Sequence, residues 1–104
     1  MKRGEIYRVE HNGRTTLFVV LSRQALCDSA HATVICAPIL ETGIGLSTQV
    51  ELRAETGATW GCIHLDALTS LPKSLLTDCV AVLSPRKLAE VEQALRVALD
   101  LPDS

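Results

Sequence analysis

Two pairs of polar side chains have the residue types and the spacing of a small catalytic or binding site. His64 and Asp66 are two residues apart, and so are Arg14 and Thr16. In an extended segment, residues separated by two point to the same face. A carboxylate orients and charges a neighbouring imidazole, so His64 and Asp66 could act as acid and base near neutral pH. The Arg14 guanidinium could hold a phosphate through two hydrogen bonds. The alternatives are a strand-end pair that satisfies backbone groups and an ordinary solvated arginine.

Two aromatic side chains are further candidates for ligand contacts. The segment His11-Asn12-Gly13 predicts a turn, so His11 should lie in the first loop, where an exposed turn histidine is the alternative to an active one. Trp60 could stack on a nucleic-acid base, pack against the fold or fill an interface between subunits. Because aromatic residues make up only 3% of the chain, we do not expect base stacking to be the main binding mode.

The charge of the chain is unevenly distributed. The net charge is −2, which argues against a general polyanion binder. Residues 1–25 nevertheless carry five basic and two acidic side chains, whereas the remainder carries five basic and ten acidic ones. This asymmetry predicts a locally positive site on an otherwise acidic protein.

The four cysteines, Cys27, Cys36, Cys62 and Cys79, lack the spacing of a metal site. No histidine or carboxylate completes a ligand set, so we expect neither a metal nor another cofactor. The N-terminus shows no secretory leader, and no apolar run approaches the ~20 residues that span a bilayer. These features predict a cytoplasmic protein with free thiols and no membrane contact.

The periodicity of the sequence predicts a single α+β domain over residues 1–104. The strand-like segments are residues 5–9, 17–21, 33–39, 48–52 and 61–65. Ser84-Pro85 then predicts a helix start, with a capping serine followed by proline at the first helical position. Apolar residues recur at helical spacing from Leu88 to Leu99, and the helix should end before Pro102. Several short strands followed by one helix are typical of a curled antiparallel sheet.

The order of these segments resembles that of a known family, the MazF/PemK/Kid toxins. That family has, in this order, an opening "RGEIW" or "RGDVY", the strands "RPVVVLS", "TVVVAPIT" and "xVEL", an "LDQ" and a closing helix "LSPEEMAEVDEAL". Each of these segments has a counterpart in the same order, along nearly the whole chain. These counterparts are Lys2–Tyr7, Leu17–Ser22, Thr33–Ile39, Gln49–Leu52, His64–Asp66 and Leu83–Leu95.

The resemblance implies a fold, an activity and a set of partners. The fold would be a small SH3-like, CcdB/PemK-type curled antiparallel β-barrel with a C-terminal α-helix. The protein would be the homodimeric toxin of a type II toxin–antitoxin system and would cut single-stranded RNA without a metal. Its 2′-hydroxyl chemistry would need a base, an acid and a cation. The cognate antitoxin would occupy the RNA groove, and the complex could bind operator DNA.

The resemblance also suggests which residues act. Thr16 and Leu40 stand where the family has its catalytic arginine and threonine. Asp66 matches a family aspartate and His64 replaces a family arginine, so the expected catalytic set is Arg14, His64 and Asp66. The expected RNA contacts are His11, Thr16, Glu41, Thr42 and Trp60.

The two substitutions leave a second function open. The chain could be a catalytically silent relative, a dimer that binds antitoxin or nucleic acid in a regulatory role. A gyrase-poison role like that of the CcdB toxins is disfavoured, because residues 101–104 lack the tryptophan on which that activity depends.

Overall fold

The computed structural model describes residues 1–53 and 59–102 of the 104-residue chain. The elements follow one another in the order β1 (Glu5–His11), β2 (Arg14–Val20), α1 (Gln24–Asp28), β3 (Thr33–Leu40), β4 (Gln49–Arg53), β5 (Thr59–His64), η1 (Leu65–Ala67), β6 (Thr69–Pro72), η2 (Lys73–Leu75), β7 (Cys79–Val82) and α2 (Pro85–Ala98). All of the strand pairings are antiparallel.

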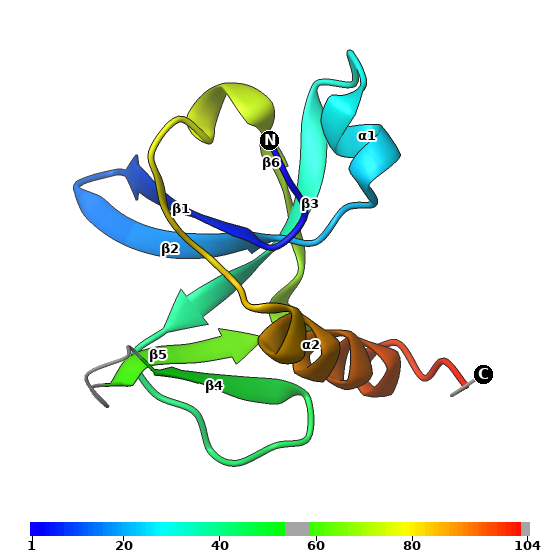
Figure 1. The fold of residues 1–104 in the computed structure, drawn as a ribbon. Helices are drawn as coiled ribbons and strands as arrows, with labels where there is room; N and C mark the ends of the chain where they lie inside the picture. The colour runs from blue at the N-terminus through cyan, green and yellow to red at the C-terminus, as the bar shows by residue number, and fades with distance from the viewer. Residues whose placement is uncertain (54–58, 103–104) are drawn as a thin grey trace.

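Within the described residues, seven strands form one curled sheet, which confirms the mainly β fold closed by a C-terminal helix. The strand order is β4-β5-β3-β2-β1-β7, and β6 pairs with β3 beside this path. In Figure 1 the β1–β2 hairpin extends to one side, while β4, β5 and α2 lie together at the bottom. The curl divides the molecule into two regions that meet along β3.

Apolar side chains lie on both faces of the central strands and form two cores. Val19 of β2 belongs to a core that includes Ile39, Ile63 and Val91 of α2. Its neighbour Val20 points the other way, into a second core. Because both faces are covered, β2 has a continuous apolar run instead of strict alternation. The second core contains Tyr7, Val9, Val20, Cys27, Val34, Cys36 and Leu76.

The first hairpin turn is shorter than the sequence suggested. His11 is the last residue of β1 and pairs with Arg14, so the turn contains only Asn12 and Gly13. Both have positive φ angles, 52° and 76°, as a type I′ turn requires. Placing His11 within a loop was therefore wrong. The residue is held at the end of a strand.

The C-terminal helix begins as predicted. The Ser84 side chain accepts a hydrogen bond from the Lys87 N–H, and Pro85 occupies the first turn. Val91 and Ala94 are buried against the sheet, and the helix ends at Ala98. Leu99 departs from the prediction, because it lies beyond the helix with 51% of its surface exposed.

Besides the 3₁₀ turns η1 and η2, three short elements were not predicted from the sequence: α1, β6 and β7. Each spans four or five residues, too few to show a clear period. β6 and β7 are specified by their pairing with β3 and β1, which are distant in sequence. None of the described helices is long and apolar enough to cross a bilayer.

Ile63 offers a test of the larger core, because its side chain is fully buried between β3, β4 and α2. We expect Ile63→Ala to lower the free energy of unfolding by about 3 kcal/mol, through lost burial and the cavity left behind. Ile44→Ala is the matched control, since Ile44 is 81% exposed, and it should change stability by less than ~0.5 kcal/mol. Urea denaturation measures both. Equal losses in the two variants would contradict this packing.

Glu5, Tyr7 and Cys79 form a small polar cluster where β1 meets β7. The Tyr7 hydroxyl donates to Glu5 Oε1 at 3.0 Å, and the Cys79 thiol lies 3.6 Å from Glu5 Oε2. Burial raises the pKa of Tyr7 to about 12, and the hydrogen bond to the Glu5 carboxylate and its charge add to the shift. Burial pushes the Glu5 pKa upward, but hydrogen bonds from the Lys2 N–H, Tyr7 and Cys79 outweigh it, so the pKa is lowered.

Tyr7 is the only tyrosine, so its ionisation can be followed directly by phenolate absorbance. We expect a midpoint near 12 in the folded protein. The side chain of an unfolded tyrosine has a pKa of about 10. The stabilisation that follows from the raised pKa of Tyr7 is therefore fully present below that pH and is lost as the pH rises through the pKa of the folded protein. Glu5→Gln should lower the midpoint by removing the neighbouring charge. A wild-type midpoint at the ordinary value would contradict the cluster.

Candidate functional site

A groove at the turn end of the β1–β2 hairpin brings together several of the predicted residues. Its volume is about 520 Å³. Leu71, Leu75 and Phe18 supply apolar walls, and Arg14 and His11 supply the polar ones. The full lining is Val9, His11, Asn12, Arg14, Thr16, Phe18, Leu71 and Leu75. The hairpin and the β6–η2 segment therefore enclose a site with both apolar and basic character.

Arg14 and Thr16 line the same groove, as their two-residue spacing predicted. Arg14 is exposed, and among the residues that the structure describes its guanidinium has no hydrogen-bond or ion-pair partner. By contrast, Arg3 pairs with Glu92 at 2.8 Å. A guanidinium that is held beside a groove without a protein partner can receive an anionic group.

Thr16 and Leu40, which the resemblance places at the family's arginine and threonine, lie on neighbouring strands. Leu17 of β2 pairs with Ile39 of β3 in an antiparallel register. Thr16 precedes Leu17 and Leu40 follows Ile39, so the two residues lie on the same side of that pair. Ile39 is buried, while Leu40 is 43% exposed on the opposite face. The fold thus brings these two side chains close to each other on adjacent strands.

The expected side-by-side placement of His64 and Asp66 on one strand is wrong. β5 ends at His64, and Asp66 lies in the 3₁₀ turn η1, where the two-residue period no longer applies. Instead, Asp66 Oδ2 accepts a hydrogen bond from the Thr48 hydroxyl at 2.5 Å. No direct hydrogen bond joins His64 and Asp66 within the described part of the chain.

Both ring nitrogens of His64 have partners near β4. Nε2 lies 2.9 Å from the Thr42 carbonyl oxygen, and Nδ1 lies 3.5 Å from Gln49 Nε2. Thr42 therefore contributes its backbone at this point. Glu41 lines a neighbouring hollow of about 300 Å³ together with Gln49 and Cys62. This region around the β3–β4 loop shares no lining residue with the Arg14 groove.

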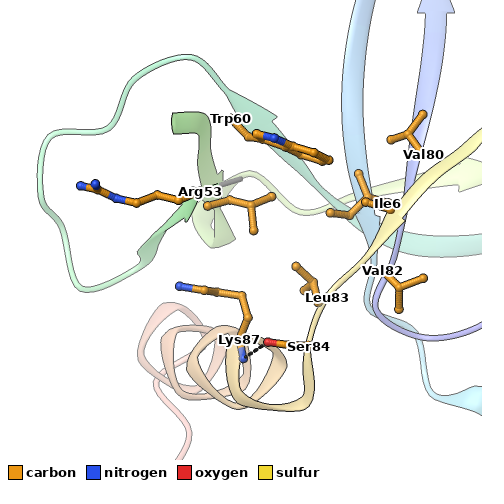
Figure 2. Close-up of a pocket in the computed structure, with 10 residues that line it drawn as sticks. Ile6, Arg53, Trp60, Val80, Val82, Leu83, Ser84 and Lys87 are labelled. Carbon is orange, nitrogen blue, oxygen red and sulfur yellow. Dashed lines mark hydrogen bonds between the residues drawn. The ribbon is translucent and has the colours of Figure 1, made fainter. Parts of the chain in front are cut away.

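Trp60 lies in a third place, a groove of about 570 Å³ between the β4–β5 hairpin, β7 and the start of α2. Figure 2 shows its indole at the top of this groove, with Arg53 and Lys87 on one side. The ring is 40% exposed. The groove has no lining residue in common with the Arg14 groove, so the structure does not bring Trp60 to Arg14.

The cysteines lie apart from the Arg14 groove lining. Cys27, Cys36 and Cys62 are buried and Cys79 is exposed, and all four are free thiols. Burial raises the pKa of Cys36 to about 12, and burial together with the Glu51 charge raises that of Cys62. Across residues 1–53 and 59–102, no three His, Cys, Asp or Glu side chains are grouped as a metal site.

Sequence reasoning missed the apolar wall of the Arg14 groove and the role of Gln49. Phe18 could have been found, because it continues the two-residue series from Arg14 and Thr16. Leu71 and Leu75 had no such signal, since they come from elements that are short and defined by distant pairing. Gln49 also gave none, because its partners lie in a loop and on another strand.

Comparisons with known proteins agree with this architecture. The family described as "PemK-like, MazF-like toxin of type II toxin-antitoxin system" matches residues 2–99. A Mycobacterium tuberculosis protein described as "Probable endoribonuclease MazF2" is 31% identical over 100 residues, covering 94% of this chain and 97% of that protein.

Solved structures match over the whole fold. A mycobacterial endoribonuclease in complex with its cognate antitoxin superposes with a TM-score of 0.87 at 24% identity, covering 100% of this chain and 99% of that one. MazF from the Deinococcus radiodurans MazE–MazF complex gives 0.79 at 23% identity, covering 98% and 97%. With the family matching residues 2–99, the chain belongs to the PemK-like, MazF-like toxins of type II toxin–antitoxin systems.

Proposed function

We propose that this protein is the endoribonuclease toxin of its toxin–antitoxin system and cuts single-stranded RNA at the Arg14 groove. Family membership and the 31% identical endoribonuclease support the activity. The observation that carries the site is the Arg14 guanidinium, unpaired among the described residues and placed beside His11 in a groove with apolar walls. A backbone phosphate would bind Arg14, and a base would lie against Phe18.

The proposed reaction uses the 2′-hydroxyl of RNA as the nucleophile. A base takes its proton, the oxygen attacks the adjacent phosphorus, and the bond to the 5′-oxygen breaks as an acid protonates that leaving group. Arg14 would neutralise charge on the phosphorane. These steps require no metal, so cleavage should persist in EDTA.

His11 is the acid–base group that the geometry favours. It lies opposite Arg14 in the β1–β2 register, and no protein hydrogen bond to its ring is found in the described residues. The alternative assignment, Asp66 with His64, has the right chemistry, but these groups already bond Thr48, Thr42 and Gln49. Under this proposal, Asp66 and His64 shape the loop beside the active groove.

The proposal also covers the oligomeric state, the partners and the cellular location of the protein. A single domain over residues 1–104 would form a homodimer, which exposed apolar side chains such as Val82 and Val97 support. The cognate antitoxin would cover the RNA site, and the complex could bind operator DNA in the cytoplasm. The relatives solved with antitoxins make that partner reasonable.

A second function rests on Thr16 and Leu40. Because neither has the chemistry of the family's arginine and threonine, the chain could be a dimer that binds antitoxin or nucleic acid without cutting. RNA binding without cleavage, in both the wild type and the variants below, would favour this function.

Arg14→Ala tests the phosphate site. We expect roughly tenfold weaker binding of single-stranded RNA, because a charge-assisted contact is lost. The slope of log affinity against log salt should fall by about 0.7, the value for one phosphate contact. Fluorescence anisotropy at several salt concentrations measures both. Arg86→Ala, at an exposed arginine on α2, is the matched control. An equal loss of RNA affinity in this variant would show that the affinity depends on net charge and would contradict a phosphate site at Arg14.

His11→Ala and Asp66→Asn separate the two acid–base assignments. With His11 as the acid–base group, its variant should cut RNA about 100-fold more slowly while binding is retained, and Asp66→Asn should have a small effect. Slow cleavage by Asp66→Asn and nearly normal cleavage by His11→Ala would instead establish Asp66 with His64 as the acid–base groups. End mapping of a single-stranded RNA in EDTA gives the rates, with His31→Ala as the control.

A further variant tests whether the groove lies on the family's catalytic face. Thr16→Arg combined with Leu40→Thr restores both reactive side chains on adjacent strands. We expect this double variant to cut faster than the wild type. If it binds RNA but gains no cleavage, the two positions do not meet the scissile phosphate.

A further inference from the structure

The loop between β3 and β4, residues 41–48, is exposed at positions 41–47. Asp66 bonds its last residue, Thr48, and two further side chains fasten its earlier part to the sheet. The Gln49 Oε1 atom accepts a hydrogen bond from the Ile44 N–H at 2.8 Å. The His64 Nε2 atom lies 2.9 Å from the Thr42 carbonyl oxygen. Gln49 and His64 face each other as a pair in the β4–β5 register, so one cross-strand pair holds both parts of the loop. In Figure 1 this loop runs below β4.

The loop rests directly on Cys62. A Cβ atom added to Gly43 would lie 2.6 Å from Cys62 Sγ and 2.8 Å from Gln49 Oε1, so no larger residue fits there without movement. Cys62 is 9% exposed beneath this contact. The accessibility of its thiol therefore reports whether the loop is closed.

The donors and acceptors around His64 fix its protonation in the closed loop. A carbonyl only accepts, so Nε2 carries the hydrogen that reaches Thr42. In a neutral imidazole Nδ1 is then an acceptor, and it faces the Gln49 amide nitrogen at 3.5 Å. The Ile44 N–H can only donate, so it binds the amide oxygen of Gln49 and leaves the amide nitrogen of Gln49 facing His64. The three contacts are mutually consistent only when His64 is neutral.

Protonation of His64 breaks this consistency. Nδ1 then carries a hydrogen that points at the amide hydrogens of Gln49. Turning the amide by 180° satisfies His64, but it presents the amide nitrogen to the Ile44 N–H and loses that bond. We propose that Gln49 and His64 form a pH-sensitive latch, closed when His64 is neutral, that positions the β3–β4 loop over Cys62. Opening would free Glu41 and Thr42, next to Leu40 on the sheet.

Charged groups face the latch from the loop, β4, η1 and α2, and Glu51 of β4 is paired with Arg53 at 3.0 Å. Carboxylates come from the loop, from β4 and from η1, and the α2 charges near Gln49 are paired with each other at 2.6 Å. Because only the neutral imidazole satisfies all three contacts, acid should open the latch. The groups concerned are Glu41, Glu51, Cys62, Asp66, Lys87 and Glu90. The latch operates in the folded protein whether or not the protein cuts RNA.

The test measures the reaction of Cys62 with 4,4′-dithiodipyridine in a Cys79→Ser background, with the modified peptide identified by mass. Rates are divided by those of glutathione at the same pH, which removes the intrinsic ionisation of a thiol. Between about pH 8, where imidazole is neutral, and about pH 5, where it is charged, we expect a roughly fivefold rise, the value of one lost hydrogen bond. Gln49→Ala should raise the rate at pH 8 roughly tenfold.

Gln49→Glu separates a latch from a general loosening in acid. The introduced carboxylate accepts from both the Ile44 N–H and a protonated His64, so this variant should close in acid and reverse the pH dependence. His64→Gln should abolish the pH dependence, whereas His31→Gln, which removes a remote exposed histidine, should preserve it. A wild-type rate independent of pH, or a Gln49→Glu variant that opens in acid like the wild type, would overturn the proposal.

Discussion

Strands β2 and β3 carry apolar side chains on both faces, and the rest of the fold covers those two faces. Val19 and Val20 are neighbours, fully buried in opposite cores. Burial of a valine contributes about 2 kcal/mol, so neither face can be left in water. α2 and the β4–β5 hairpin cover one face, whereas α1, β6 and η2 cover the other. A flat sheet of this length could not be covered by so few elements, and the curl of the sheet provides the enclosure.

The same constraint decides where a functional site can form. The ends of β1, β2 and β3 extend beyond the two cores, so residues there remain accessible although their backbones are fixed. Arg14 and His11 are held by strand pairing at the hairpin end, and Leu71 and Leu75 close the groove from the second core. A guanidinium on a rigid strand loses little freedom when it binds an anion, which favours a preorganised contact. The groove is thus a consequence of how the second core is covered.

Polar contacts around β4 and β5 serve a different purpose. Asp66 with Thr48, and His64 with Gln49 and Thr42, fasten the β3–β4 loop, which is exposed at residues 41–47. Because this loop contributes little apolar burial, single hydrogen bonds decide its position. Under the proposed latch, a change in the charge of His64 moves this loop and leaves both cores in place. Asp66 and His64, which have recognisable acid–base chemistry, thus support loop structure in this chain, whereas His11 does not within the described residues.

The sequence by itself determined the strands with long apolar runs, the capped helix after Ser84 and the shared face of Arg14 and Thr16. Those features depend on local periodicity and on the preferences of single residues, both of which can be read along the chain. Only the tertiary structure decided that Trp60, His64 and Arg14 lie in three separate places and that Leu71 and Leu75 complete a groove. Their positions follow from pairings between distant segments, such as β6 with β3, and from the end of β5 at His64, where the two-residue period stops. Local pattern cannot encode those contacts, because they are selected by the burial of both faces of the sheet.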